Sequence, residues 1–381
     1  MDTGFGANQL YSACRLTITH HFPDDDGLEC EPFNGTGFLV QFPDGDNRFG
    51  IVTNRHLTDA VFYNEAEYKG STIKAVKIEL WQSRNFRIEF KVDDPKPLYH
   101  DDETIDVAVI PFGPKIDPHM VGTPYDKLEN IIPDPTIDHL IFNHGLSWPY
   151  LLECEELWSL LEPGEFVLFP GYPVWYDKSQ VRPVFRSGMI ASDPQTDYRR
   201  KKGDPDKYDG NHQVLFDAFS TSGNSGSPVF VAQRGMAPLP FQFRTSPDDK
   251  SPRTAAQLEF SGYHRAFLIG INAGHFNDPK NDSPNDHAGL SRMHKLSVIM
   301  EILRANKSAS TAVSHIKVLV PKDVADARNA LAGTRARADR DDSILALHRE
   351  GKSRKAIATE VGCSASTVSR VVNKQAGTGE E

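Results

Sequence analysis

A glycine-rich loop between two apolar stretches can supply a nucleophilic serine. It spans residues 223–228 and reads GNSGSP. A serine hydroxyl attacks a carbonyl only if a base takes its proton and hydrogen-bond donors hold the oxyanion that forms. Because Gly223 has no Cβ, the backbone there can turn so that its N–H and the N–H of Ser225 point at one place. The loop therefore predicts Ser225 as a nucleophile and Gly223 and Ser225 as oxyanion-hole donors.

Such a serine needs a histidine and a carboxylate, and each must come from an element that brings it to the loop. His56 follows the apolar strand predicted at residues 49–55, FGIVTNR. Asp106 opens a short buried-strand pattern at residues 106–110, DVAVI. Both residues lie at strand boundaries, where a side chain can face a cleft. The chain order histidine, aspartate, serine is one of several known for this triad.

These motifs and their order resemble those of the chymotrypsin-like serine proteases, in particular the trypsin-like and HtrA-like branch. The matching segments are GTGFLV at 35–40, TNRH at 53–56, GYP at 171–173, SGMIAS at 187–192, FDA at 216–218 and LIGINAG at 268–274. The resemblance covers residues 10–303 and implies a mostly β fold class with two six-stranded β-barrels. It also implies that His56 acts as general base and acid, that Asp106 orients it, and that Ser225 attacks a peptide carbonyl.

The resemblance further implies a substrate pocket beside the serine. Its lining would be Phe219, Asn272, Ala273 and Gly274. Phe219 stands where trypsin-like specificity requires an acid, so basic substrate residues are disfavoured and small or apolar ones are favoured. Asn224 stands where zymogen-type members keep an aspartate, so activation by trimming of the N-terminus is not expected.

Composition bounds the class of protein. With 381 residues, 39% of them hydrophobic, the chain can bury one large core and a small second domain. The first residues lack a basic and apolar leader, and no eighteen apolar residues run together, so we expect no membrane partner. The four cysteines, Cys14, Cys30, Cys154 and Cys363, have no C-x-x-C spacing, which favours reduced thiols in a cytoplasm. No pattern predicts a metal or another cofactor.

The apolar pattern predicts short strands up to residue 275 and helices only after them. A helix is expected within residues 291–306, where apolar residues recur at helical spacing. Residues 114–160 and 194–211 are expected to be insertions. Residues 234–261, rich in Pro, Ser and charge, are expected to form a solvated loop.

The predicted domain organisation has a large body and a small tail. The protease domain is expected at residues 1–304, a linker with a short helix within 324–332 at 305–338, a helix-turn-helix domain at 339–375 and a disordered tail at 376–381.

Residues 344–372 in this tail resemble the helix-turn-helix of resolvases and related recombinases. Ser353 can cap one helix, Gly362 allows the turn, and Ile357, Val361 and Val368 can pack on a shared buried face. The residues expected to face a DNA major groove are Ser364, Ala365, Ser366, Thr367, Ser369 and Arg370.

Charge separates the tail from the rest of the chain. Residues 335–374 carry nine basic and five acidic residues, a net charge of +4, whereas the whole chain has −10. DNA contact through the tail requires such a basic module, because phosphates repel an acidic body. DNA is therefore the expected partner of the tail, and docking to a protein is the alternative.

We therefore expect a cytoplasmic, bacterial serine endopeptidase that hydrolyses a protein or peptide substrate and carries a DNA-binding helix-turn-helix. The alternative is a DNA-binding regulator whose protease fold is inactive and serves as a binding module. The intact set of His56, Asp106 and Ser225 favours the enzyme.

Overall fold

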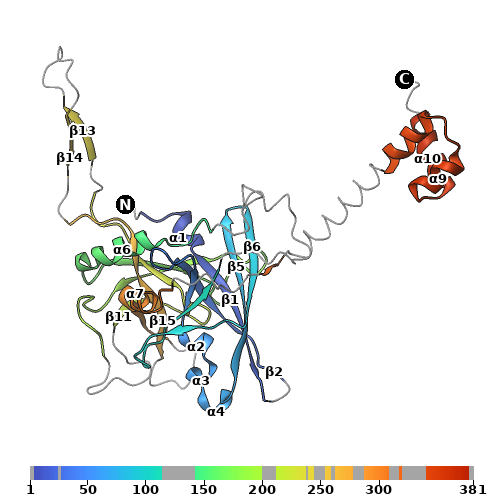
Figure 1. Ribbon diagram of the computed structural model, residues 1–381. Helices are drawn as coiled ribbons and strands as arrows, with labels where there is room; N and C mark the ends of the chain where they lie inside the picture. Colours follow the sequence, from blue (N-terminus) through green and yellow to red (C-terminus); the bar gives the residue numbers. More distant parts are fainter. Residues whose placement is uncertain are drawn as a thin grey trace. The chain divides into compact units, whose positions relative to one another are not determined.

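The computed structural model describes residues 4–24, 27–113, 142–199, 212–236, 239–243, 254–258, 262–277, 287–308, 317–319 and 340–376. These residues belong to two compact units, and the boundary between the units follows Leu319. The first unit holds the β-sheets, and the second holds the C-terminal helices (Figure 1).

An antiparallel nine-stranded sheet forms the N-terminal part of the first unit. In spatial order its strands are β17 (Lys317–Leu319), β6 (Phe86–Asp93), β5 (Thr72–Ser83), β1 (Ala13–Phe22), β3 (Phe33–Gln41), β4 (Phe49–Thr53), β8 (Ala108–Phe112) and β7 (Leu98–Tyr99), and β2 (Leu28–Glu29) pairs with β1. The period-two pattern of the sequence sets which face is buried. In β1, Leu16 and Ile18 are buried, whereas Thr17 and Thr19 are half-buried.

The second sheet of this unit closes into a six-stranded barrel. Its strands are β9 (Phe166–Gly171), β10 (Val184–Ile190), β11 (Gln213–Ala218), β12 (Pro228–Val231), β15 (Phe267–Asn277) and β16 (His287–Lys295), in the order β10-β11-β16-β15-β12-β9. A mostly β body with one six-stranded barrel is thus confirmed.

The described residues do not show the expected second barrel. Closure requires hydrogen bonds between the two edge strands of a sheet. In the described part of the chain, the N-terminal sheet ends at β17 and β7, and these two strands do not pair with each other. β17 also falls inside the predicted linker, where it pairs with β6. The predicted helix at 324–332 lies outside the described residues.

The sequence pattern predicts helices only at the end of the body, but the structure also has helices earlier in the first unit. The first unit contains α1 (Ala7–Tyr11), α2 (Arg55–Thr58), α3 (Ala60–Tyr63), α4 (Glu65–Tyr68), α6 (Trp148–Leu157), the 3₁₀ helix η1 (Trp158–Leu160) and α7 (Leu296–Ala305). α6 lies in the predicted insertion and is capped by Ser147, whose side chain accepts a hydrogen bond from the N–H of Tyr150. The helix predicted within residues 291–306 is α7.

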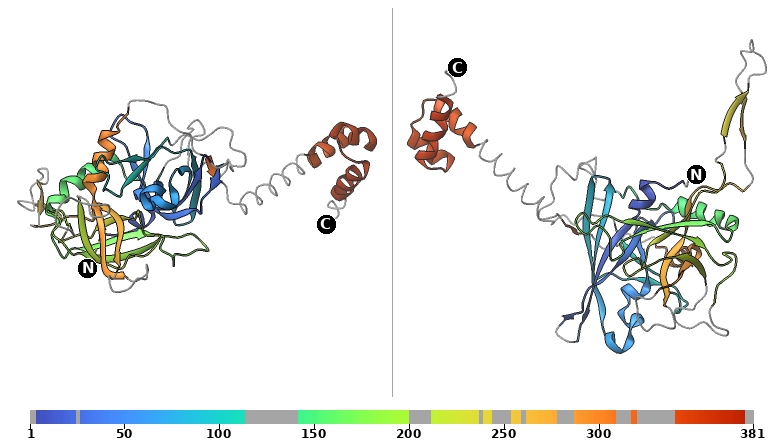
Figure 2. Two further views of the ribbon diagram at one scale, coloured as in Figure 1. Left: turned by 90° about the horizontal axis from the view of Figure 1, so that it is seen from below. Right: turned by 180° about the vertical axis from the view of Figure 1, so that it is seen from behind.

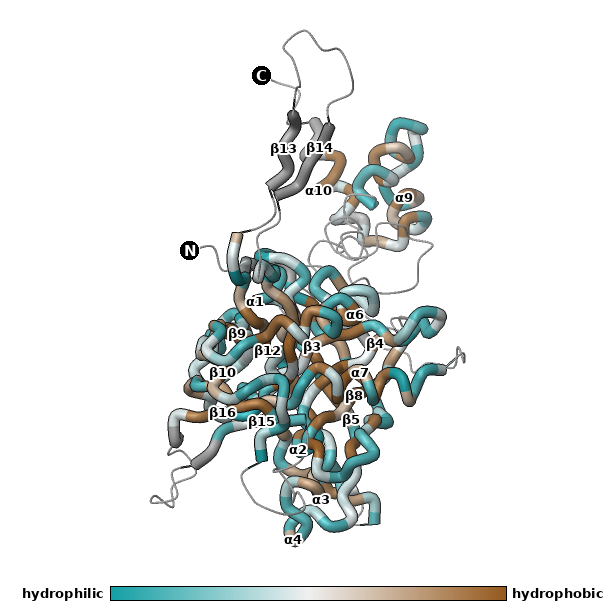
Figure 3. Tube along the Cα trace, turned by 90° about the vertical axis from the view of Figure 1, so that its left-hand side faces the viewer, coloured by the Kyte–Doolittle hydropathy of each residue, from teal (hydrophilic) through white to brown (hydrophobic). Residues whose placement is uncertain are grey.

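One apolar core joins the two sheets. Phe38 of β3, Phe169 of β9 and Ile299 of α7 belong to the same buried cluster. The hydrophobic parts of β3, β8, β12 and α7 accordingly gather inside this unit (Figure 3). α6 and α7 lie side by side (Figure 2). Arg304 of α7 donates a hydrogen bond to the carboxylate of Glu155 on α6 at 2.8 Å. The two sheets are therefore fixed relative to each other by shared packing.

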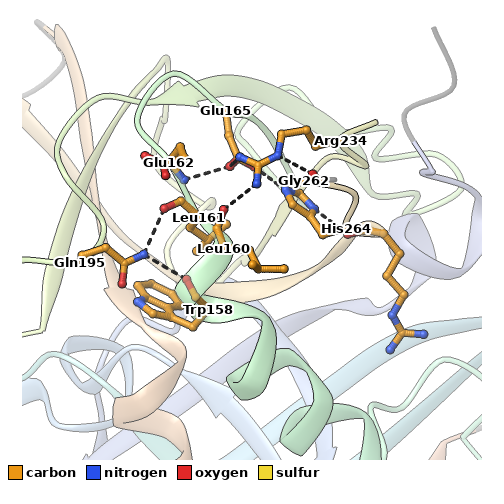
Figure 4. A network of polar contacts seen from close by, with 10 residues as sticks. Trp158, Leu160, Leu161, Glu162, Glu165, Gln195, Arg234, Gly262 and His264 are labelled. Atoms are coloured by element: carbon orange, nitrogen blue, oxygen red, sulfur yellow. Dashed lines mark hydrogen bonds and ion pairs between the residues drawn. The ribbon is translucent and has the colours of Figure 1, made fainter. Parts of the chain in front are cut away.

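The segment expected to be a solvated loop contains a hairpin. β13 (Leu239–Phe243) pairs antiparallel with β14 (Thr254–Leu258). At the base of the hairpin, Arg234 and His264 pair through their main chains. The Glu165 carboxylate contacts Nη1 of Arg234 at 2.7 Å and Nε2 of His264 at 2.8 Å (Figure 4). This network ties both ends of the insertion to the start of β9.

The second unit contains a helix over residues 340–349, then α9 (Arg354–Val361) and α10 (Ala365–Ala376). The predicted cap is confirmed, since the Ser353 side chain accepts a hydrogen bond from the N–H of Ala356. The predicted turn is also confirmed, because Gly362 has φ 67°, the left-handed conformation that favours glycine. Ile357 and Val368 pack in one buried cluster. The local rules of capping and apolar spacing thus suffice to define this unit.

Candidate active site and nucleic-acid interface

Two hydrogen bonds hold His56 on Asp106. His56 lies in α2, directly after β4, and Asp106 lies just before β8, which pairs with β4. The main-chain N–H of His56 donates to Oδ1 of Asp106 at 2.8 Å, and Nδ1 of the ring lies 2.7 Å from Oδ2. Because the carboxylate accepts the Nδ1 proton, Nε2 is the ring atom left to act as a base.

The surroundings of Asp106 keep its side chain charged. The side chain is 1% exposed. Burial alone would raise the pKa of the carboxyl, but the His56 ring, the His56 N–H and the charge of Arg292 hold that pKa below its usual value. Its main chain is also fixed, because its carbonyl accepts from Nδ2 of Asn54 at 2.8 Å. The carboxylate is therefore suited to orient an imidazole and to stabilise it when protonated.

His294 contributes to this site from the barrel, and sequence reasoning did not find it. Its Nε2 accepts a hydrogen bond of 3.2 Å from the main-chain N–H of Asp106. Burial lowers the pKa of His294 to about 4, so the ring is neutral near pH 7 and can accept. The sequence of β16, HAGLSRMHK, carries no local motif that would single out this histidine.

The serine loop is bound to the same sheet that carries His56. The main-chain carbonyl of Ser225 accepts from the N–H of Thr36 on β3 at 2.9 Å. The Thr36 hydroxyl in turn donates to the carbonyl of Gly223 at 2.7 Å. The Thr36 carbonyl also accepts a hydrogen bond of 2.8 Å from the hydroxyl of Thr53, the last residue of β4, three residues before His56. The predicted nucleophile and base are thus brought to one end of the β3–β4 pair.

Two glycines allow this close approach. Gly226 has φ 86°, and a Cβ on it would lie 2.0 Å from the carbonyl oxygen of Thr36. Gly223 has φ 91°, and a Cβ on it would lie 2.3 Å from the carbonyl oxygen of Tyr172. No other residue type fits either position without a shift of the backbone.

The predicted oxyanion donors are available. Within the described ranges, neither the N–H of Gly223 nor that of Ser225 donates a hydrogen bond. The same residues show no hydrogen bond between the His56 ring and the Ser225 hydroxyl. Such bonds are often long before substrate binds. The arrangement can polarise a carbonyl, and the contact between base and nucleophile would have to shorten in the complex.

The predicted pocket residues fall into two groups. Phe219 is 49% exposed, and its carbonyl accepts from Nη2 of Arg186 at 2.7 Å. Asn272 is instead fully buried, and its Nδ2 donates to the Ser220 hydroxyl at 3.0 Å and to the Asn224 carbonyl at 2.8 Å. Asn272 therefore positions the serine loop. Ala273, which is buried, and Gly274, which is half-buried, follow it on β15.

Of the predicted DNA contacts, four side chains are described, and they gather at the start of α10. Ser364 and Ser366 are exposed, and Thr367 and Ser369 are half-buried. The Ser364 hydroxyl accepts from the N–H of Thr367 at 3.2 Å, so it caps the helix. The side chains of Ala365 and Arg370 lie outside the described part. The start of α10 therefore offers hydroxyls beside the N-terminus of a helix, which suit phosphate and base contacts.

Comparison with known families confirms the helix-turn-helix predicted for the second unit. Residues 335–375 match the helix-turn-helix domain of resolvase. The C-terminal part of the chain is therefore a resolvase-type helix-turn-helix, a DNA-binding domain. No curated protein matches the chain. Within the described ranges, no helix combines the length and apolar character needed to span a membrane.

Proposed function

We propose that the chain is a serine endopeptidase joined to a DNA-binding helix-turn-helix. The observation that carries the proposal is the pair of bonds from His56 to Asp106, at 2.8 and 2.7 Å, at the end of the sheet that binds the Ser225 loop. Histidine–carboxylate pairs also occur in purely structural roles. Here, however, the His56–Asp106 pair lies near a serine loop in which the N–H groups of Gly223 and Ser225 donate to no described residue.

The reaction that this geometry supports has two steps. The Ser225 oxygen adds to the carbonyl carbon of a peptide while its proton passes to Nε2 of His56, and the carbonyl oxygen takes negative charge near the N–H groups of Gly223 and Ser225. The C–N bond then breaks, and His56 gives its proton to the leaving amine. Water attacks the resulting ester through the same base, which releases the acid and restores Ser225.

The two units would act on one target. The basic tail would hold the acidic body near DNA, where the protease would cut a DNA-bound partner or its own connecting segment. A cytoplasmic location fits both activities and is part of the proposal.

A second candidate function is a DNA-binding regulator whose protease fold only binds peptides. The missing hydrogen bond between the His56 ring and the Ser225 hydroxyl, within the described ranges, favours it. Digestion of a library of random decapeptides by the full chain separates the two. If the chain is an enzyme, wild type should cleave the peptides and Ser225→Ala should not. No cleavage by wild type, or equal cleavage by wild type and Ser225→Ala, would favour the regulator.

A further inference from the structure

A short turn is fixed against the serine loop. The N–H of Val174 donates to the carbonyl of Ser222 at 3.2 Å, and the N–H of Tyr176 donates to the carbonyl of Pro173 at 2.8 Å. The carbonyl oxygen of Tyr172, just before the turn, is the atom that a Cβ on Gly223 would meet first, at 2.3 Å. The turn at residues 173–176 therefore lies next to one of the two proposed oxyanion donors.

The turn presents apolar side chains to solvent. Trp175 is 72% exposed, and Val174 is also exposed. Within the described part of the chain, the Trp175 ring makes no hydrogen bond, ring contact or cation contact. An indole supplies a large apolar surface at a low cost in conformational entropy, and residues of this type dominate peptide recognition. Nothing in the described fold requires a tryptophan at this place.

The turn and β15 meet different residues of the serine loop. β15 contacts the loop through Asn272, which binds Ser220 and Asn224, whereas Val174 of the turn binds Ser222. If the acyl part of a bound peptide lies along β15 and the Gly223 N–H holds its carbonyl oxygen, the turn borders the loop next to that oxygen. Val174 and Trp175 would then be placed to contact the leaving-group side of the peptide.

A second exposed aromatic residue lies beside the base. Tyr63 is 55% exposed, and its ring centroid lies 6.4 Å from that of His56. The rings of Phe33 and Tyr63 pack edge to face, with 5.8 Å between their centroids. Apolar surface thus flanks both the proposed base and the proposed oxyanion donors.

We infer that Trp175, with Val174, selects substrates that have a bulky apolar residue at the first or second position after the scissile bond. This inference rests on the proposed protease function. It adds a substrate class to that function, namely unfolded or extended protein segments in which an aliphatic or aromatic side chain follows the cut.

The test compares cleavage sites in a library of random decapeptides, read by mass spectrometry, for the full chain and three variants. Wild type should enrich apolar residues after the cut, and Trp175→Ala should reduce that enrichment about tenfold. Trp175→Phe should keep most of it. Leu28→Ala, which removes a side chain that is 58% exposed on β2, is the matched control and should change nothing. Unchanged enrichment in Trp175→Ala would overturn the inference.

Labelling with a fluorophosphonate probe separates this inference from the proposed function. Trp175→Ala should label as wild type does, because the ring touches no member of the triad. If wild type neither labels nor cuts, the proposed function fails, and binding of the same immobilised decapeptides to Ser225→Ala tests the surface alone. If the double variant Ser225→Ala/Trp175→Ala no longer retains apolar decapeptides that Ser225→Ala retains, the role of Trp175 in peptide binding is supported. If both variants bind the same decapeptides, that role is refuted.

Discussion

The main-chain N–H of Asp106 donates a hydrogen bond to Nε2 of His294, which lies 188 residues later in the chain. This bond joins the N-terminal sheet, after whose strand β4 His56 follows, to the barrel that contains β16. Asp106 thereby faces His56 with its side chain and His294 with its main chain. The orientation of the proposed base depends on a contact between the two sheets.

We expect His294→Leu to destabilise the first unit by about 1–3 kcal/mol, because the buried N–H of Asp106 would lose its acceptor. His294→Gln, which keeps an acceptor oxygen, should recover part of this loss. Urea unfolding followed by fluorescence measures both. His21→Ala, at a half-buried histidine on β1, serves as the control. Equal stability of His294→Leu and wild type would contradict a role for the bond.

Acid should destabilise the protein through the same residue. Burial lowers the pKa of His294 from 6.5 to about 4, so between these values the unfolded chain binds a proton that the folded chain does not. Stability should therefore fall as pH decreases from 6.5 toward 4, by at most about 3 kcal/mol from this group.

Two other histidines, His20 and His144, have pKa values that burial lowers in the same direction. The variant His294→Gln isolates the effect, because it cannot titrate. The free energy of unfolding of His294→Gln should change less between pH 6.5 and 4.5 than that of wild type. Identical pH dependence in both proteins would show that His294 does not remain neutral in the fold.

Gly226→Ala should be more harmful than an alanine at an unconstrained glycine with the same backbone conformation. Gly45 has φ 88° and open space around it, so Gly45→Ala should cost only about 1–2 kcal/mol from backbone strain. At Gly226 the added methyl also meets the Thr36 carbonyl, which should add about 1–3 kcal/mol and displace the serine loop. Thermal unfolding of both variants gives the comparison, and similar costs would refute the close approach.

The three residues of the proposed triad could be singled out in the sequence because each lies in a local motif. His56 ends a strand, Asp106 opens one, and Ser225 lies between two glycines, so periodicity and turn chemistry suffice to single them out. The helix-turn-helix is accessible for the same reason, since its cap, turn and buried face are all local. Its match to the resolvase domain confirms that reading.

The supporting contacts depend on residues far apart in the chain. His294 reaches Asp106 and Asn272 reaches Ser220 only because the strands pair in one register, and no local pattern encodes that register. Nor does strand periodicity show whether a sheet closes, since closure depends on whether its edge strands meet. The composition of residues 234–261 indicated solvent exposure, but it did not show that β13 pairs with β14.

Arg370 should contribute to DNA affinity. We expect Arg370→Ala to weaken DNA binding by about 1–3 kcal/mol and to reduce its dependence on salt. Fluorescence anisotropy with a labelled duplex at several salt concentrations measures both effects. Arg349→Ala removes the same charge from an exposed position outside the proposed contact set and should have a smaller effect. Equal losses in the two variants would argue for a general charge effect in place of a specific contact.

The central claim is that Ser225 is an activated nucleophile, and labelling by a fluorophosphonate probe tests it most directly. The full chain would be treated at neutral pH, with and without DNA, and the modified residue located by mass spectrometry. The account predicts a single adduct on Ser225 in wild type and none in Ser225→Ala or His56→Ala. Wild-type protein that stays unlabelled under both conditions, or that labels equally well in His56→Ala, would contradict it.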